Sequence, residues 1–218
     1  EPVTGVHTDD IHDFWRPNYL STALVDGKYS LAAYHGALEA AWGEYQARGG
    51  VAFDEIARFC YHQPFTKMAV KAHDRLCRIV GSDLDRDQRR AQIDASLELN
   101  RRTGNSYTAS IYVGLLSLLE RDPDELAGRR IGFFSYGSGS VSEFFTGIVQ
   151  PGYRDLLRTA ADAASLDDRR PIDYPRYRAL HESVDAVQGS DYETAAETSG
   201  PFRFAGVVDH VRRYQRRD

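Results

Sequence analysis

His62 is the residue of this sequence whose surroundings most clearly favour chemistry. It follows the apolar run Phe59–Tyr61, which favours a strand, and it precedes Pro64, which is typical of the first turn of a helix. Lys67 and Lys71 are four residues apart, so they project from one face of that helix. An imidazole beside two ammonium groups at a helix N-terminus suits a substrate with a carbonyl group and a negative charge. Two simpler interpretations stay open: a histidine satisfied at a strand end, and a solvated basic helix face.

A second polar cluster, Thr103–Thr108, precedes a segment that reads as a buried helix over 106–119. Gly104 permits an unusual backbone conformation, and Asn105 or Ser106 can cap the helix that follows. An asparagine amide at the mouth of a buried helix can also hold a substrate carbonyl or a catalytic water. A helix cap and a substrate-binding amide are both compatible with the sequence.

A third cluster is the glycine-rich turn after Phe134-Ser135-Tyr136, where the chain reads Gly137-Ser138-Gly139. The exposed N–H groups of such a turn can cradle an anion or an oxyanion, although hairpin turns of this composition are common without any function. The turn is not a nucleophile elbow, because the glycine spacing around Ser138 differs and the next segment reads as a strand.

The composition of the chain limits the binding partners and the cellular compartment that we expect. The net charge is −5, which gives no general electrostatic case for nucleic acid or an anionic membrane, and no apolar run is long enough for a bilayer. Cys60 and Cys77 favour a reducing cytoplasm and read as small buried hydrophobes. We also expect no metal site, because five further histidines have no metal-ligand spacing with Cys, Asp or Glu: His7, His12, His35, His73 and His181.

The hydrophobic pattern predicts helices that alternate with strands around one buried helix, which is typical of a layered α/β protein. Residues 1–27 read as irregular. Helices are expected over 29–48, 53–58, 64–80, 85–100, 106–119, 153–164 and 174–184. Strands are expected over 59–61, 130–136, 142–149 and 202–208, a polar linker over 165–172, and a solvated basic tail over 212–217.

These motifs, in this order, resemble the C-terminal half of the 3-hydroxy-3-methylglutaryl-CoA synthase family, in its bacterial mevalonate-pathway branch. The resemblance covers nearly the whole chain and rests on 13–17, 25–28, 61–67, 104–108, 134–139, 200–206 and 209–210. It implies a thiolase-like α/β fold, in which two halves, each a five-stranded sheet with helices, form a five-layered αβαβα sandwich. Residues 1–218 would then be the C-terminal half, with a leading segment (1–27), an α/β core (28–164) and an extension with a C-terminal strand (165–218).

The resemblance also implies an activity. The family is an acyltransferase that needs no cofactor and condenses acetyl-CoA with acetoacetyl-CoA to 3-hydroxy-3-methylglutaryl-CoA and CoA. A cysteine takes the acetyl group, a glutamate removes a methyl proton, and the carbanion adds to the ketone of acetoacetyl-CoA. By resemblance His62 polarises that ketone, Asp13 orients polar partners and Asn105 holds an acyl carbonyl. The remaining substrate- or CoA-binding residues that it implies are Lys67, Lys71, Tyr107, Ser135, Tyr136 and Ser138.

This sequence departs from the family in one large respect. The nucleophilic cysteine and the glutamate belong to the N-terminal half, for which the chain has no counterpart, and Cys60 does not stand where the family keeps its nucleophile. The chain also begins with Glu1 rather than Met. We therefore expect one piece of a split or cleaved synthase, which is inactive alone, active with the N-terminal half, and part of a homodimeric enzyme.

Three alternatives remain. A related synthase of polyketide β-branching uses acyl carrier protein, and its tunnel mouth should carry a basic docking patch that this acidic chain does not clearly offer. A non-catalytic scaffold half is disfavoured because Asp13, His62 and Asn105 are all present. A thiolase or ketoacyl synthase would share the fold, but we expect different motifs around its histidine.

Overall fold

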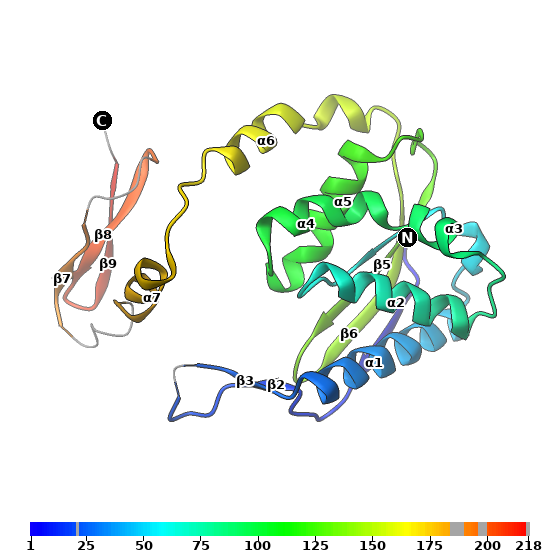
Figure 1. Ribbon diagram of the computed structural model, residues 1–218, viewed down its shortest axis with the longest axis horizontal. Helices are drawn as coiled ribbons and strands as arrows, with labels where there is room; N and C mark the ends of the chain where they lie inside the picture. The colour runs from blue at the N-terminus through cyan, green and yellow to red at the C-terminus, as the bar shows by residue number, and fades with distance from the viewer. Residues whose placement is uncertain (21, 184–189, 196–199, 217–218) are drawn as a thin grey trace. The chain divides into compact units, whose positions relative to one another are not determined.

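The chain folds into two units, which are described separately. The computed structural model describes residues 1–20, 22–183, 190–195 and 200–216 (Figure 1). The first unit, Glu1–Asp167, contains a mixed sheet with helices, and the second, Asp168–Asp218, contains a helix and a small meander. In the described part of the chain, no helix combines the length and the apolar character that crossing a membrane requires.

The sheet of the first unit has the strand order β1-β6-β5-β4. Its strands are β1 (Thr4–Thr8), β4 (Arg58–Tyr61), β5 (Arg130–Gly137) and β6 (Val141–Ile148). The pair β4–β5 is parallel, and the other two pairs are antiparallel. The three strands predicted over 59–61, 130–136 and 142–149 are confirmed.

The prediction that residues 1–27 are irregular is wrong at β1. This strand pairs with β6, with Thr4 opposite Phe145 and Thr8 opposite Val141. The partner strand lies more than 130 residues further along the chain, so the order of β1 comes from non-local pairing that a local pattern does not reveal. Two further short strands of this segment, β2 (Phe14–Trp15) and β3 (Leu24–Val25), pair with each other in a ribbon.

The resemblance implies five strands in the sheet, but four pair in the described residues. Beyond β4, the N–H of Phe59 donates to the carbonyl of Gln92 at 3.0 Å, and the chain then enters the 3₁₀ helix η2 (Asp94–Leu97). The Ser96 hydroxyl donates to the carbonyl of Ile93 at 2.7 Å, a local bond that competes with strand pairing. The edge of β4 is therefore covered by this segment rather than by a fifth strand.

Helices cover both faces of the sheet (Figure 1). The helices α1 (Gly27–Ala47) and α2 (Thr66–Ile79) share one apolar cluster with Phe134 and Phe144 of the sheet. On the opposite face, α5 (Ser110–Arg121) joins a second cluster through Leu118, which packs with Phe133. Adjacent residues of β5 thus point to opposite clusters, as expected for a strand buried on both faces. The predicted layered α/β class is confirmed.

Several helix boundaries differ from the prediction. The helix 29–48 is confirmed as α1, whose first turn is capped by the Asp26 carboxylate through the N–H groups of Lys28 and Tyr29, both at 3.0 Å. The prediction that Pro64 opens α2 is wrong: Phe65 is the N-cap residue, so Pro64 lies outside the helix. The prediction of a single helix over 85–100 is also wrong.

That region forms α3 (Arg86–Ala91), η2 and α4 (Glu98–Thr103). Its interruption brings Ile93 and Leu97 into the first apolar cluster, so tertiary burial overrides the local helical pattern. The helix predicted over 106–119 becomes the 3₁₀ helix η3 (Tyr107–Ala109) followed by α5. The prediction that this helix is buried on all sides is wrong, because Tyr112 of α5 is 61% exposed.

Two other predicted helices are shorter than expected. The segment predicted over 53–58 is the 3₁₀ helix η1 (Phe53–Glu55). The segment predicted over 153–164 is split into the 3₁₀ helix η4 (Tyr153–Leu156) and α6 (Thr159–Asp167), which extends into the predicted linker.

The described residues of the second unit form α7 (Tyr174–Ser183) and a meander with the strand order β7-β8-β9. Its strands are β7 (Tyr192–Glu193), β8 (Phe202–Val208) and β9 (Val211–Arg216). The predicted helix 174–184 and strand 202–208 are confirmed, apart from residue 184, which lies outside the described residues. The basic tail is solvated as predicted, but up to Arg216 it is an exposed strand paired with β8. Residue 217 lies outside the described residues.

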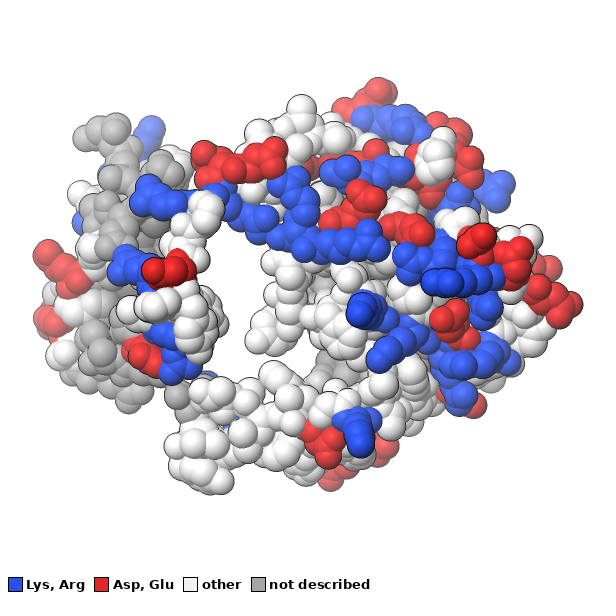
Figure 2. All heavy atoms as spheres, in the orientation of Figure 1, with Lys and Arg blue, Asp and Glu red and all other residues white. Residues whose placement is uncertain are grey.

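Charged side chains cover the first unit in a mixed pattern. Figure 2 shows Lys and Arg side chains among Asp and Glu side chains over the face that contains α2, α3 and α4. Several of these charges form ion pairs, such as Arg75 with Glu39 at 2.5 Å and Arg90 with Asp94 at 2.5 Å. This face therefore has no uniform sign of charge.

We expect the substitution Gly5→Ala to destabilise the chain by about 3 kcal/mol. A Cβ at Gly5 would lie 2.0 Å from the carbonyl oxygen of Ala41 and 2.3 Å from the backbone nitrogen of Tyr45, so β1 would have to move away from α1. The matched control is Gly36→Ala in α1, where a Cβ meets nothing within 4 Å and should stabilise the helix by roughly 0.5–1 kcal/mol. Urea denaturation measures both changes, and equal effects of the two substitutions would contradict the close contact.

Candidate functional site

A cavity of about 580 Å³ opens beside the C-terminal ends of the parallel strands β4 and β5. Its wall comes from the β2–β3 ribbon, the first turns of α1 and α2, the loop before α5 and the end of β5. Lining residues include Phe14, Val25, Ser30, Tyr34, His62, Phe65, Met68, Lys71, Asn105, Tyr107, Tyr136 and Ser138. Six of the nine site residues expected from the sequence thus meet at one cavity: His62, Lys71, Asn105, Tyr107, Tyr136 and Ser138.

His62 directly follows β4 and is held on both sides of its backbone. Its N–H donates to the carbonyl of Phe134 at 2.8 Å, and its carbonyl accepts the hydroxyl of Tyr34 at 3.0 Å. The residue is 8% exposed, and the Nδ1 of its ring lies 3.2 Å from the Oγ of Ser110. Burial lowers the pKa of the imidazole to about 4, against a smaller opposing effect of a hydrogen bond with the Tyr107 backbone. The ring is therefore neutral near pH 7, so it can meet a ligand through hydrogen bonds rather than through charge.

Asp13 lies behind the cavity wall and is fully buried. Its Oδ2 accepts three hydroxyl groups, from Tyr136 at 2.8 Å, Ser138 at 3.0 Å and Ser30 at 3.3 Å. All three donors line the cavity, so the carboxyl group fixes the orientation of hydroxyls that a ligand would meet. Its Oδ1 has no hydrogen-bond partner among the described residues.

The glycine-rich turn contributes through its hydroxyl group. Ser138 donates to Asp13 at 3.0 Å. Burial, and next the hydrogen bond to Asp13, raise the pKa of the neighbouring Tyr136, so this phenol stays protonated and remains a donor. An anion cradle formed by the N–H groups of the turn stays a prediction.

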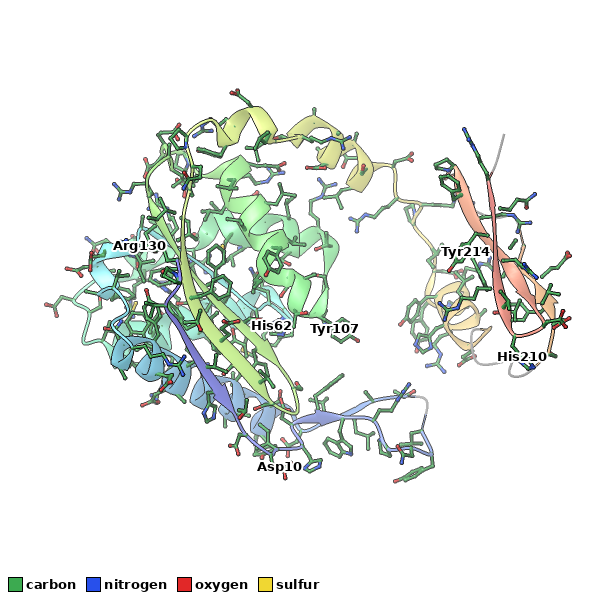
Figure 3. All side chains as sticks on the ribbon, turned by 180° about the vertical axis from the view of Figure 1, so that it is seen from behind. Asp10, His62, Tyr107, Arg130, His210 and Tyr214 are labelled. Carbon is green, nitrogen blue, oxygen red and sulfur yellow. The ribbon has the colours of Figure 1, made fainter. Side chains whose placement is uncertain are left out.

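Asn105 belongs to a strained loop at the cavity wall. It stands one residue before the N-cap Ser106 of η3, and neither η3 nor α5 has a side-chain cap, so the predicted capping of the buried helix is wrong. Its Oδ1 accepts the N–H of Tyr107 at 2.8 Å. This leaves the Nδ2 group as the part of the amide that can donate to a ligand. Tyr107 has the left-handed φ of 54°, which is unfavourable for a residue with a side chain, and the residue is 67% exposed. The labelled side chains of His62 and Tyr107 lie close together in Figure 3.

The two lysines differ in their relation to the cavity. Lys71 lines it, and its Nζ lies 5.9 Å from the centre of the Phe65 ring, a cation–π distance. Lys67 is exposed and is not among the lining residues. Ser135 also stays outside the lining, because it alternates with Tyr136 along β5 and pairs with Glu143. The helix pattern alone did not separate the two lysines.

Neither cysteine is placed for nucleophilic chemistry. Both are buried free thiols, and neither lines the cavity. Burial raises the pKa of Cys60 strongly and that of Cys77 to about 11, so both stay protonated thiols near neutral pH. Among the described residues, no three His, Cys, Asp or Glu side chains group as metal ligands.

Three residues of the site were not predicted from the sequence: Ser30, Tyr34 and Ser110. Tyr34 belongs to the apolar stripe of α1, and its hydroxyl role depends on the His62 carbonyl, 28 residues away. Ser110 is a small residue of an apolar helix, which reads as packing. A polar residue in an otherwise apolar stripe is the signal that points to both serines, although it does not name their partners.

The sequence matches the family model described as "hydroxymethylglutaryl-coenzyme A synthase C terminal" over residues 1–84 and 81–179. A curated relative, the hydroxymethylglutaryl-CoA synthase of Enterococcus faecalis, is 36% identical over 211 residues, which cover 95% of this chain and 53% of the relative. The chain therefore spans about half the length of this relative.

Two solved structures are similar to the chain over nearly its whole length. One is an HMG-CoA synthase complexed with CoA, with 34% identity and a TM-score of 0.85, covering 99% of this chain and 56% of the other. The second is MvaS in complex with 3-hydroxy-3-methylglutaryl coenzyme A, with 34% identity and a TM-score of 0.82, covering 100% of this chain and 57% of the other. The predicted thiolase-like α/β fold is confirmed, with this chain as about half of it.

We expect acid to destabilise the chain through its two most buried histidines. Burial lowers the pKa of both His62 and His73 from 6.5 to about 4. Between these values the unfolded chain binds protons that the folded chain does not, so the free energy of unfolding falls as the pH falls from 6.5 towards 4. The advantage of the wild type over His73→Gln should shrink by roughly 2 kcal/mol between pH 7 and pH 5.

Urea denaturation at the two pH values measures this difference. His62→Gln is the second variant and should show a change of the same sign. A stability difference that is independent of pH would contradict a neutral buried ring in either position.

Proposed function

Since the chain belongs to the hydroxymethylglutaryl-CoA synthase family, we propose that it supplies one side of the active site that condenses acetyl-CoA with acetoacetyl-CoA. The products are 3-hydroxy-3-methylglutaryl-CoA and CoA, and the enzyme is an acyltransferase of the mevalonate pathway. The observation that carries this proposal is the meeting of a neutral His62, Asn105 and the Asp13 hydroxyl cluster at one cavity.

In this proposal His62 acts on the ketone of acetoacetyl-CoA. When the carbanion of the acetyl group adds to the ketone carbon, the C=O bond becomes an alkoxide, and an N–H donor near that oxygen stabilises it. A neutral imidazole provides such a donor without the cost of a buried charge. The low pKa of the ring supports this role.

Asn105 and the Asp13 cluster hold the substrate around this centre. The Nδ2 group of Asn105 can donate to a thioester carbonyl, because its Oδ1 is occupied by the N–H of Tyr107. Asp13 acts as a positioning residue, since it contacts Tyr136, Ser138 and Ser30 rather than the cavity itself. The hydroxyls that it orients face the acyl portion of the substrate.

The nucleophile and the base come from the N-terminal half of the synthase. Cys60 and Cys77 are buried, protonated and away from the cavity, so a cysteine thiolate and a glutamate must be supplied from outside the described residues. We propose that this chain acts together with that half, and that the complete enzyme is a homodimer. The coverage of about half of the similar synthases supports the first point.

We propose diffusible CoA thioesters, rather than acyl carrier protein, as substrates. Among the described residues that line the cavity, Lys71 is the only Lys or Arg, which suits one phosphate contact better than a protein docking patch. The mixed charges seen in Figure 2 support the same choice. The reaction needs no cofactor, and we place it in the cytoplasm, without nucleic acid or membrane partners, in keeping with the net charge of −5.

The test uses this chain together with the N-terminal half and compares wild type with His62→Asn. We expect the variant to acquire the acetyl adduct from acetyl-CoA normally, because the cysteine belongs to the other half. Condensation should fall by about 10²–10³-fold, because a transition-state donor is lost. Intact mass spectrometry measures the adduct, and release of CoA in the presence of acetoacetyl-CoA measures the condensation.

Two outcomes would sink the proposal. One is turnover by this chain without the N-terminal half. The other is a His62→Asn variant that condenses at the wild-type rate.

Lys71 and Lys67 provide a matched pair for the CoA contact. We expect Lys71→Met to raise KM for the CoA substrates about fivefold with kcat unchanged, because one exposed charge contact contributes about 1 kcal/mol. The effect should weaken at high salt. Lys67→Met removes an exposed charge outside the lining and should change KM less than about twofold. Steady-state kinetics at two salt concentrations measure both variants, and equal effects of the two would contradict the assignment of Lys71.

A further inference from the structure

Ser110 contacts the ring of His62 but is not among the residues that line the cavity. It is the first residue of α5 and is fully buried. Its Oγ accepts the backbone N–H of Gln63 at 2.8 Å and lies 3.2 Å from the Nδ1 of His62. One hydroxyl thus contacts both the catalytic ring and the peptide bond that follows it.

We propose that Ser110 is a positioning residue that fixes the proton of the neutral His62 ring on Nε2, so that the ring meets a ligand in the cavity as a hydrogen-bond donor. The catalytic consequence rests on the proposed function, whereas the position of the proton does not.

Counting hydrogens supports this assignment. A serine hydroxyl donates one hydrogen and accepts through its lone pairs. The N–H of Gln63 uses an acceptor position of Oγ, so the hydroxyl hydrogen still needs an acceptor. Among the hydrogen bonds of the described residues, the Nδ1 of His62 is the acceptor within reach.

The opposite tautomer would leave a buried group unpaired. If Nδ1 carried the proton, it would donate to Oγ, and the hydroxyl hydrogen of a fully buried serine would have no acceptor. Buried donors without partners are costly and rare. The favoured neutral ring therefore accepts at Nδ1 and carries its proton at Nε2.

The proton position matters because of the charge that develops in the reaction. A donor at Nε2 stabilises an alkoxide, whereas a bare Nε2 would direct a lone pair towards it and repel it. Ser110 thereby decides whether the same imidazole helps or opposes the addition step.

The backbone of Tyr107 is a second partner of the ring, and it opposes this assignment only if it meets Nδ1 rather than Nε2. It also hydrogen-bonds to His62, and a carbonyl can only accept. Donation from Nδ1 to that carbonyl would reverse the tautomer. The two arrangements are distinguishable by measurement.

The experiment is long-range ¹H–¹⁵N correlation spectroscopy on the complete synthase containing this chain, labelled with ¹⁵N-histidine. This chain contributes seven histidines, and the His62→Gln variant assigns the His62 signals as those missing from its spectrum. In the wild type we expect a proton-bearing Nε2 and a bare Nδ1. Ser110→Ala should convert the ring to a mixture of tautomers or to the Nδ1-protonated form and should lower condensation by at least tenfold, whereas Ser110→Thr, which keeps the hydroxyl, should retain the wild-type signals.

Ser117→Ala is the matched control on the same helix. The Ser117 hydroxyl is equally buried, donates to the carbonyl of Ala95 at 2.6 Å and accepts the N–H of Leu99 at 3.2 Å, but it does not contact His62. Its loss should lower the melting temperature without moving the His62 signals. A wild-type ring protonated at Nδ1, or a folded Ser110→Ala protein with the wild-type tautomer, would overturn the proposal. Absence of condensation by a wild type with the expected tautomer would count against the proposed function alone.

Discussion

The parallel pairing of β4 with β5 is the interaction on which the rest of the site depends. It sets Tyr61 opposite Phe134, and the ladder continues one step further through the bond from the His62 N–H to the Phe134 carbonyl at 2.8 Å. Because both strands end at the same edge of the sheet, the residues that follow them open into one cavity, as ligand sites in α/β sheets generally do. His62 reaches this edge from β4, and the Asp13-binding hydroxyls of Tyr136 and Ser138 reach it from β5.

Buried hydrogen bonds then fix the positions of the site residues that the strand pairing brings together. The hydroxyl of Tyr34 holds the His62 carbonyl, and the hydroxyl of Ser110 holds both the ring and the next peptide N–H. The carboxyl group of Asp13 accepts hydroxyl groups from Ser30 of α1 and Tyr136 of β5. These contacts join segments far apart in sequence, so they stabilise the cavity only when the sheet and both helix layers are in place. Such preorganised dipoles are what a site for a developing oxyanion requires.

Much of this architecture could be predicted from the sequence, because β5 and β6 are strongly apolar and α1 has a continuous apolar stripe. It could not reveal β1, whose order depends on β6, nor the break in the segment 85–100, which follows from burial of Ile93 and Leu97. Six of the nine expected site residues line the cavity. That they belong to one site was implied by the family resemblance and not by their spacing in the sequence. Helical periodicity put Lys67 beside Lys71, and only the three-dimensional position of α2 separates them. The role of Ser110 could not be predicted from the sequence, because its partners His62 and Gln63 are 48 and 47 residues away.

The electrostatic character of the cavity follows from the same burial. An imidazole taken out of water between β4 and α5 loses its affinity for a proton, which lowers the pKa of His62 to about 4. A group of this kind is a poor general acid or base near neutral pH, because its charged form is scarcely populated, but it is a good fixed donor. In the reaction that we propose, the groups that change protonation or form a covalent bond do not come from the lining residues of this chain, and its two buried thiols, which lie outside the lining, stay protonated. In the function that we propose, the described residues orient and stabilise the substrate, and the proton-removing base and the nucleophile face them from the N-terminal half of the enzyme.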